Sequence, residues 1–238
     1  MPTLLVFGAR NLGRAIARHM AGIGWEVAAV SRSADSLEPL AKEIDGALTI
    51  AADAGRAEDV ERAFAETRSR FGSVDLVVVA ISPGIRGRTF GGGAIVEADP
   101  EAFAPYVDDL LPALFTVLRV GARVLAEQGS GTYVQITGGS ARRGMAGRGP
   151  WAAGAFATRG LIQAAASELR EQGVHVALLI VDATIESDRT RPFLEGRPKE
   201  ASATEEDVAQ AVACLAAQSA RAWTHELQIT PSGDRWVP

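Results

Sequence analysis

A glycine-containing turn near the amino terminus has residue types that bind phosphate groups. Gly8 and Gly13 enclose this turn, which lies between a short aliphatic run and an amphipathic stretch. Backbone N–H groups at such a strand-to-helix turn, together with the helix N-terminus, face the pyrophosphate of a bound dinucleotide. The turn is shorter than G-x-G-x-x-G and lacks one glycine, so tight packing of strand against helix is a second interpretation. The dinucleotide contacts predicted here are Gly8, Arg10, Asn11, Leu12 and Gly13.

Arg32 follows the second aliphatic run, at the place where the ribose of a dinucleotide is recognised. An acidic residue there holds the ribose hydroxyls of NAD, whereas an arginine pairs with the 2′-phosphate of NADP. The segment Ser31-Arg32-Ser33 contains no acid, and Arg10 could add a second cation, so NADP(H) is the favoured cofactor. A solvated surface arginine is the alternative. Asp53, after the third run, could accept a hydrogen bond from the adenine amino group or be an ordinary loop aspartate.

A parallel sheet would bring these residues to one edge, and the chain alternates strands and helices as such a sheet requires. Each short β-branched or aliphatic run is followed by a stretch with helical spacing. The pattern predicts one doubly wound α/β Rossmann domain over 1–238, with about seven parallel strands and helices on both faces. The expected strands are 3–7, 26–30, 47–50, 74–81, 132–136, 175–181 and 226–229, and the longest expected helices are 101–128 and 150–172.

Two segments, 82–100 and 184–203, are expected to be loops over the site. The first combines Arg86, Arg88 and the run Gly91-Gly92-Gly93. It leaves the sheet beside the fourth strand, at the carboxyl edge where doubly wound folds bind ligands. Two interpretations stay open: a loop that closes over a substrate, or a disordered tip, which three consecutive glycines permit.

Composition excludes several classes of protein. The 238 residues carry a net charge of −5, which argues against nucleic acid or an anionic membrane as the main partner. The aliphatic runs 76–81 and 176–181 are six residues each, whereas a membrane span needs about 20. The single cysteine, Cys214, and three scattered histidines exclude a disulfide scaffold and a zinc site, so no metal is expected. With no charged leader, we expect a cytoplasmic protein in which Cys214 is buried on an amphipathic helix.

Several motifs together resemble those of the short-chain dehydrogenase/reductase family. With the strand and helix pattern over the whole length, they are Gly8-Ala9, Gly13-Arg14-Ala15-Ile16-Ala17, Asp53, Val74-Asp75-Leu76, Gly160-Leu161 and Ala166-Ser167-Glu168-Leu169. Three stretches, 137–141, 175–187 and 222–227, further resemble a divergent branch of that family. The resemblance implies a Rossmann domain, an NAD(P) cofactor, a small carbonyl or alcohol substrate, and homodimers or homotetramers built through the two long central helices. It also implies cofactor contacts at Ala80, Asp182 and Ile185.

The family's catalytic residues are absent at the positions that the resemblance assigns to them. The tyrosine of Tyr-x-x-x-Lys falls on Trp151 and its lysine on Ala155. The serine falls on Gly138, and the helix asparagine falls on Asp109, or on Asp108 by a shift of one residue. No lysine of the chain has a tyrosine four residues before it, so the motif occurs nowhere. Because loss of a general acid/base costs a factor of about 10² to 10⁴, replacement of the whole set indicates a reshaped pocket.

Side chains near the lost positions could take over part of the chemistry. The catalytic candidates are Ser140, Asp109, Trp151 and Arg142, with Thr137, Tyr106, Asp108 and Arg143 as further groups of the same kinds. Ser140 offers a hydroxyl, and Asp109 is expected to face the pocket side of the central helix. Arg142 could polarise a substrate oxygen as a fixed cation, and Trp151 could be a packing residue or a wall of the pocket. Surface solvation or helix capping is the alternative for each polar group.

Three functional hypotheses follow. The first, which we favour, is an atypical short-chain dehydrogenase/reductase that uses NADP(H) to act on a carbonyl or conjugated carbonyl substrate with a non-standard proton donor. The second is a non-redox enzyme, a cyclase, isomerase or dehydratase, on the same scaffold, which uses no nicotinamide cofactor. The third is a catalytically silent partner subunit.

Overall fold

Seven parallel strands form one sheet in the computed structural model, which describes residues 1–83 and 89–234. The strand order is β3-β2-β1-β4-β5-β6-β7, so the order reverses between β1 and β4, next to the loops that follow both strands. The α/β doubly wound prediction is therefore confirmed. The strands are β1 Thr3–Phe7, β2 Glu26–Ser31, β3 Leu48–Ala51, β4 Leu76–Val79, β5 Gly131–Gly138, β6 Val174–Val181 and β7 Glu226–Ile229.

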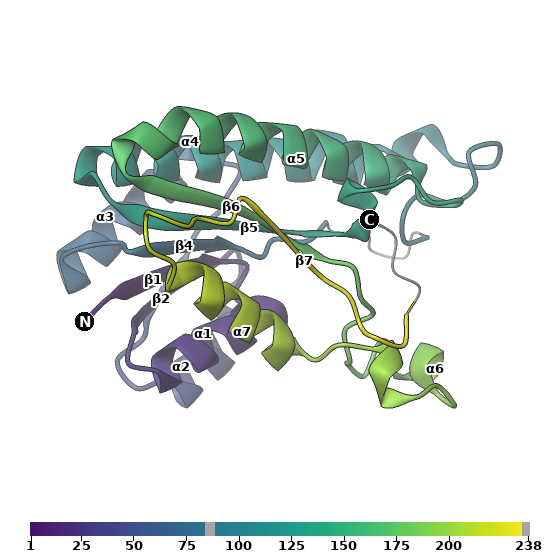
Figure 1. Ribbon diagram of the computed structural model, residues 1–238, viewed down its shortest axis with the longest axis horizontal. Helices are drawn as coiled ribbons and strands as arrows, with labels where there is room; N and C mark the ends of the chain where they lie inside the picture. Colours follow the sequence, from purple (N-terminus) through teal and green to yellow (C-terminus); the bar gives the residue numbers. More distant parts are fainter. Residues whose placement is uncertain (84–88, 235–238) are drawn as a thin grey trace.

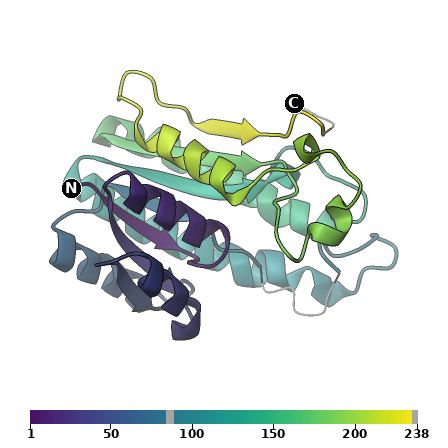
Figure 2. The same cartoon turned by 90° about the horizontal axis from the view of Figure 1, so that it is seen from below.

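Helices cover both faces of the sheet (Figure 1; Figure 2). One face carries α3 Ala57–Phe71, α4 Leu111–Gln128 and α5 Gly149–Leu169, and the other carries α1 Leu12–Gly22, α2 Glu38–Glu43 and α7 Glu205–Ala216. Side chains of β1 alternate between two cores, since Leu5 and Phe7 pack under α3 and α4 while Leu4 and Val6 pack under α1 and α7. Burial on both faces explains why inner strands such as β1 and β4 are almost continuously apolar.

The expected helix 101–128 is divided in the structure. A 3₁₀ turn, Pro100–Ala102, and a π-helical segment, Pro105–Leu110, precede α4. Pro112, in the first turn of α4, has no N–H to donate to a carbonyl one turn earlier, which favours a wider turn ahead of it. This π-helical segment lies against α5, and it brings Tyr106 to the candidate site described below.

The expected loop 184–203 is mostly irregular but contains two short helical elements. It contains the four-residue helix α6 Arg191–Leu194 and a 3₁₀ turn, Lys199–Ala201. Backbone hydrogen bonds join its two ends, from Glu186 N to Ala203 O at 2.9 Å and from Ala203 N to Thr184 O at 3.1 Å. Within the described ranges, no helix combines the length and apolar character needed to cross a membrane.

The prediction that Cys214 is buried is wrong, because its side chain is exposed on α7. The buried face of this helix is formed by Val208, Val212 and Leu215, and Cys214 falls on the opposite side of the helix. The helix begins with a capping box in which the Thr204 hydroxyl accepts from Asp207 N and the Asp207 carboxylate accepts from Thr204 N.

His175, at the amino end of the sheet, is expected to make stability depend on pH. It is 1% exposed, its ring stacks on Trp223 at 5.3 Å, and its Nε2 donates to the Thr224 carbonyl at 2.9 Å. Burial lowers the pKa of His175, so below about pH 6.5 the unfolded chain binds a proton that the folded chain does not. Stability should therefore rise with pH up to about 6.5 and then level off.

The measurement is thermal unfolding of the wild type and His175→Phe between about pH 5 and pH 7.5. The variant keeps a ring beside Trp223 but has no proton to bind. We expect the wild type to lose more stability on acidification than the variant. If the stability of the two proteins changed with pH in the same way, His175 would not be the source of the pH dependence.

Candidate functional site

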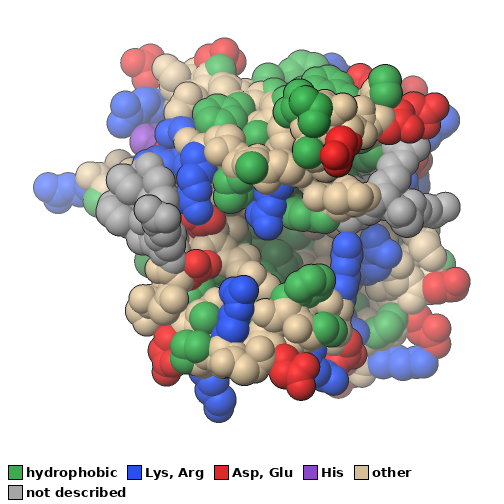
Figure 3. Space-filling view, turned by 90° about the vertical axis from the view of Figure 1, so that its right-hand side faces the viewer, with side chains coloured by type: hydrophobic (Ala, Val, Ile, Leu, Met, Phe, Trp, Pro, Cys, Tyr) green, Lys and Arg blue, Asp and Glu red, His purple; other side chains and the backbone are tan. Residues whose placement is uncertain are grey.

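The candidate site lies at the carboxyl ends of the strands. Figure 3 faces this edge of the molecule and shows a hollow near the centre of the face, with Lys and Arg side chains around it. Because the strands are parallel, one edge of the sheet holds the start of each loop that follows β1, β2, β4, β5 or β6. Doubly wound folds bind ligands here.

Both glycines of the first turn are required by close backbone packing. A Cβ on Gly13 would lie 2.1 Å from the Gly8 carbonyl oxygen, and a Cβ on Gly8 would lie 2.6 Å from the Ala80 carbonyl oxygen. Gly8 also has φ +93°, a conformation that favours glycine. Close packing by these glycines brings the turn, Ala80 and the N-terminus of α1 together at the switch point of the sheet, and a dinucleotide contact at the turn stays a prediction. Leu12 is half-buried and packs on the α1 side of the core.

Asn11 adopts a strained backbone conformation at the start of α1. Its φ of +44° and ψ of −113° make it the one non-glycine residue with positive φ in the described part of the chain. The missing glycine of the shortened turn explains this, because a non-glycine residue takes a conformation that glycine adopts without strain. Asn11 is exposed at the N-terminus of α1, the end of a helix that a phosphate approaches.

Replacing Asn11 by glycine is expected to raise the free energy of unfolding by about 1 kcal/mol, because it removes strain of this kind. Chemical denaturation measures the change, and Asn11→Ala is the matched control. Alanine removes the same side chain but keeps the Cβ, and so should not stabilise the protein. A glycine variant less stable than the wild type would contradict the strain argument.

Arg32 and Arg10 lie beside this turn with exposed side chains. In the described part of the chain, neither guanidinium has a hydrogen-bond or ion-pair partner. Arg14, one turn into α1, is instead paired with Glu43 at 2.7 Å. No carboxylate follows β2 directly, so Arg10 and Arg32 are available to a phosphate group.

Asp53 organises its own loop after β3. Its Oδ1 accepts a hydrogen bond from Gly55 N at 3.0 Å, and its backbone N–H donates to the Asp59 carboxylate at 2.8 Å. The Asp53 side chain is half-buried. The structure therefore shows a loop-capping role, and an adenine contact through Asp53 stays a prediction.

A small apolar pocket lies where the family's catalytic residues would be. Its volume is about 30 Å³, room for one or two water molecules. Its lining contains no Asp, Glu, Lys, Arg or His, and consists of Ile81, Tyr106, Leu110, Leu114, Ile136, Thr137, Trp151, Gly154, Ala155 and Thr158. The Thr158 hydroxyl donates to the Gly154 carbonyl at 2.8 Å, whereas Thr137 and Tyr106 keep hydroxyl protons for which the described residues provide no acceptor.

The indole ring of Trp151 packs close to the backbone of Gly138 in this pocket. A Cβ on Gly138 would lie 3.3 Å from Cζ2 of Trp151, so the indole packs where a serine side chain would begin. Ala155, one turn after Trp151 on α5, lines the same pocket. Trp151 therefore occupies space that Gly138 leaves open, beside Ala155 in the same pocket lining.

The run Gly91-Gly92-Gly93 packs against the start of α5. A Cβ on Gly91 would lie 2.7 Å from the Arg148 side chain, and one on Gly92 would lie 2.4 Å from the Pro150 ring. The Tyr106 hydroxyl accepts a hydrogen bond from Gly91 N at 2.7 Å in a buried position. Gly91 and Gly92 are therefore packed on the start of α5, while closure of the whole loop over a substrate stays a prediction.

The structure describes only part of the remainder of this loop. Arg86 and Arg88, named above from the sequence, lie outside the described residues. Phe90, immediately before the glycines, is 43% exposed and its ring lies 5.3 Å from that of Trp151. The ring of Tyr106 contacts Trp151 from another side, edge-on at 5.4 Å.

Asp182 forms an ion pair at the mouth of the site. Its Oδ2 accepts from Arg143 at 3.0 Å and from Gln228 at 3.4 Å, and its side chain is 11% exposed. A Cβ on Gly139 would overlap the Asp182 carboxylate, so glycine is needed at that position. Ile185, three residues later, is half-buried and packs on the core beside α7. Asp182 and Arg143 thus stand beside Gly139, the residue that follows Gly138.

Three catalytic candidates do not line the pocket. Ser140 is 0% exposed and its Oγ has no hydrogen-bond partner in the described part of the chain. Arg142 is paired with Glu226 at 3.4 Å, a carboxylate that Arg159 also binds with two nitrogens. Because Tyr106, Leu110 and Leu114 face the pocket at spacings of four, Asp109 is turned outwards and is exposed, as is Asp108.

Tyr106, Phe90 and the glycine run were not predicted as a unit. Tyr106 was named only as one of several side chains near the lost residues, and its contact with Gly91 joins segments 15 residues apart. A usable signal was the scarcity of tyrosine, since the chain has only two. Tyr133, the other one, is fully buried under α4 and burial raises the pKa of its hydroxyl, so it cannot serve the site.

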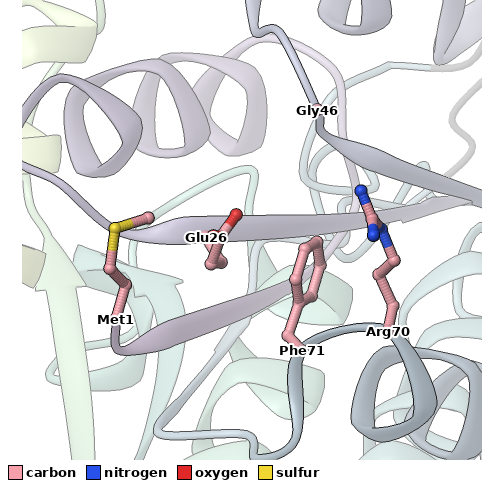
Figure 4. Close-up of a pocket in the computed structure, with 5 residues that line it drawn as sticks. All are labelled: Met1, Glu26, Gly46, Arg70 and Phe71. Atoms are coloured by element: carbon pink, nitrogen blue, oxygen red, sulfur yellow. The ribbon is translucent and has the colours of Figure 1, made fainter.

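A second, larger pocket lies at the opposite edge of the sheet. Figure 4 shows its lining residues, Met1, Glu26, Gly46, Arg70 and Phe71, around a space of about 390 Å³. They come from the amino ends of β1, β2 and β3 and from the end of α3. Ligands of doubly wound folds bind at the carboxyl ends, so we do not assign this pocket to the site.

Comparisons with known proteins agree with this geometry. The family described as Enoyl-(Acyl carrier protein) reductase matches residues 7–229. A 3-oxoacyl-(acyl-carrier-protein) reductase of Staphylococcus epidermidis is 27% identical over 230 residues, covering 91% of this chain and 92% of the relative. A 2-dehydro-3-deoxy-L-rhamnonate dehydrogenase (NAD(+)) of a Sphingomonas species is 27% identical, with 81% of this chain and 73% of the relative covered.

Solved structures give the same result. An alcohol dehydrogenase from Thermococcus sibiricus, complexed with 5-hydroxy-NADP, superimposes with a TM-score of 0.81 at 25% identity, covering all of both chains. Fold and topology together define a Rossmann-type α/β protein with its candidate site at the carboxyl edge of the sheet. The chain belongs to the short-chain dehydrogenase/reductase family, whose members matched here are oxidoreductases.

Proposed function

We propose that this protein is an NADP(H)-dependent reductase of an uncharged carbonyl or conjugated carbonyl compound. The observation that carries the proposal is the pair Arg10 and Arg32, which lie beside the glycine turn with no partner among the described residues. Two cations there, with no acid after β2, suit the extra phosphate of NADP(H). The Thermococcus sibiricus relative, complexed with 5-hydroxy-NADP, supports this assignment.

The residues present fit the phosphate-bearing half of the cofactor. Gly8 and Gly13 leave no Cβ between the turn and its neighbours, so the turn and the N-terminus of α1 can hold the pyrophosphate. Arg32 and Arg10 would hold the 2′-phosphate. The nicotinamide half of the cofactor would lie near Ala80, Asp182 and Ile185 at the edge of the sheet. The ion pair between Asp182 and Arg143 would border the space for it. NADPH, when bound, supplies the hydride for reduction.

The pocket residues then act on the substrate oxygen by hydrogen bonding. Thr137 and Tyr106 have hydroxyl protons to donate, and both line the pocket. A conjugated substrate suits this arrangement because hydride addition leaves an enolate, which donors can stabilise without full proton transfer at that moment. Ser140, Asp109 and Arg142 have no part in this scheme, and Trp151 acts as a wall.

A non-redox reaction on the same scaffold is the second candidate. The volume of about 30 Å³ and the bulk of Trp151 favour it, because they restrict the place where a nicotinamide would meet a substrate. An isomerase or dehydratase would use Thr137 and Tyr106 in the same positions without a cofactor.

Hydride transfer separates the two candidates. NADPH absorbance is followed with a panel of uncharged conjugated carbonyls, for example cinnamaldehyde and cyclohexenone. We expect saturable NADPH loss with at least one compound. In Thr137→Val, which keeps the shape but removes the hydroxyl, the rate should fall by about 10- to 100-fold. If bound NADPH is never consumed by any panel member, the redox proposal fails and the non-redox reading replaces it.

A further inference from the structure

Two aromatic rings from different segments are in contact at the pocket, and one of them, Trp151, lines it. Phe90 and Trp151 lie 5.3 Å apart between ring centroids, with 45° between their planes. Trp151 lines the pocket and is half-buried, whereas Phe90 is 43% exposed. The lining of the pocket is apolar apart from the hydroxyls of Tyr106, Thr137 and Thr158.

We propose that this site binds a flat, uncharged, conjugated molecule that inserts between the Phe90 and Trp151 rings. This deepens the proposed function by naming the substrate class of the same site. Two aromatic faces attract a planar π system through stacking, and a saturated molecule of equal size gains much less from them. A lining without ionised side chains disfavours charged ligands, since no group there would offset their loss of water.

Insertion requires the two rings to separate. A flat ring needs about 3.5 Å to each neighbour, so the centroids must move to about 7 Å apart. The loop backbone is fixed, because Gly91 and Gly92 pack on Arg148 and Pro150 and Gly91 N donates to Tyr106. The Phe90 side chain must therefore rotate to separate the rings, and its exposure to solvent leaves room for this rotation. Arg148 lies over the Phe90 ring at 5.4 Å, an exposed contact that costs little to lose.

Two hydroxyls of the lining residues select for one oxygen on the ligand. Thr137 and Tyr106 both line the pocket together with Trp151, and both can donate a hydrogen bond. A planar molecule with a single terminal oxygen would place its π system between the rings and its oxygen on these donors. A conjugated carbonyl, or the allylic alcohol derived from it, has this shape.

Calorimetric titration with cinnamyl alcohol tests the inference, with 3-cyclohexylpropan-1-ol as the saturated, non-planar control ligand. Neither compound carries a charge or reacts with cysteine. We expect cinnamyl alcohol to bind about 5- to 10-fold more tightly than the control ligand. Phe90→Leu should remove most of that preference, since leucine keeps apolar bulk but has no π face. Phe115→Leu, on the exposed face of α4, is the matched control and should change nothing.

Titrations without and with NADPH make the outcome independent of the proposed function. A preference for cinnamyl alcohol in either condition supports the inference, even if NADPH itself does not bind. Equal affinity for the two ligands, no binding of either in both conditions, or an unchanged preference in Phe90→Leu overturns it. Trp151→Leu is a second variant with the same expected loss, and its fold is checked by thermal unfolding.

Discussion

Replacing Trp151 by tyrosine together with Ala155 by lysine is expected to raise NADPH-dependent reduction of benzaldehyde by about 10²- to 10⁴-fold, the contribution of a positioned general acid. Tyrosine can pass a proton to the substrate oxygen, which tryptophan cannot. A lysine cation nearby lowers the pKa of that tyrosine and holds it ready to react. Both positions line the same pocket and lie one turn apart on α5, so the two new side chains would meet.

Gly138→Ser can be added only after Trp151 has been replaced. A Cβ on Gly138 would lie 3.3 Å from Cζ2 of the indole, so a serine beside the wild-type tryptophan would crowd the pocket. Tyrosine is the smaller side chain and relieves this contact. The triple variant should therefore be at least as active as the double variant, whereas Gly138→Ser alone should be less stable than the wild type.

Steady-state rates measured by NADPH absorbance give the result. Trp151→Phe with Ala155→Lys is the matched control, because it has the same bulk as the double variant but no phenolic proton. Thermal unfolding confirms that each variant is folded. If the tyrosine and lysine variant binds NADPH but shows no gain in activity, the pocket serves other chemistry and the site is not simply a depleted version of the family's.

Arg32→Ala is expected to weaken NADPH binding by about 10- to 100-fold, because hydrogen bonds to charged groups are worth about 1.5–3 kcal/mol. NADH has no 2′-phosphate, so its affinity should change by less than about twofold. Arg32 has no ion pair to lose in the described part of the chain, so the variant should fold normally. Direct titration of both cofactors measures the two changes.

Two further variants complete this test. Arg10→Ala should show a smaller selective loss of NADPH, since Arg10 is the second cation beside the turn. Arg119→Ala, on the exposed side of α4, removes the same charge far from the turn and should leave both affinities unchanged. If Arg32→Ala lowered the affinities for NADPH and NADH equally, the assignment of NADP(H) as the preferred cofactor would be wrong.

The centre of the sheet could be predicted from the sequence because β1, β4 and β6 are short, largely apolar runs buried on both faces. β1 and β7 have the bounds expected from their residue patterns. The ends of β4 could not be predicted, because the apolar run 74–81 continues beyond the hydrogen-bonded strand Leu76–Val79. The expected helix 101–128 was also too long, since the effect of Pro112 on the preceding turn depends on the backbone geometry around it.

The position of the glycine turn and of Arg32 could be predicted because these residues are local. Gly8 and Arg32 each follow a strand directly and Gly13 lies in the first turn of the next helix, so their place at the edge of the sheet follows from the strand order. Arg142 could not be placed, because its partner Glu226 is 84 residues away on β7. Asp109 was misplaced because the face that a helical residue presents depends on where the helix begins.

The pocket itself depends on contacts between distant segments. Phe90, Tyr106 and Trp151 come from a loop, a π-helical segment and α5, and their ring contacts have no counterpart in local sequence. The glycine run was ambiguous for the same reason, since its close packing on Arg148 and Pro150 appears only in three dimensions.

Calorimetric titration of the wild-type protein with NADPH and with NADH, at one fixed salt concentration, tests the central claim most directly. The proposed function predicts that NADPH binds at least about tenfold more tightly than NADH, because Arg10 and Arg32 meet a phosphate that NADH lacks. Binding of neither cofactor would contradict a reductase and favour a cofactor-free reaction, while equal binding of both would contradict the role assigned to the two arginines.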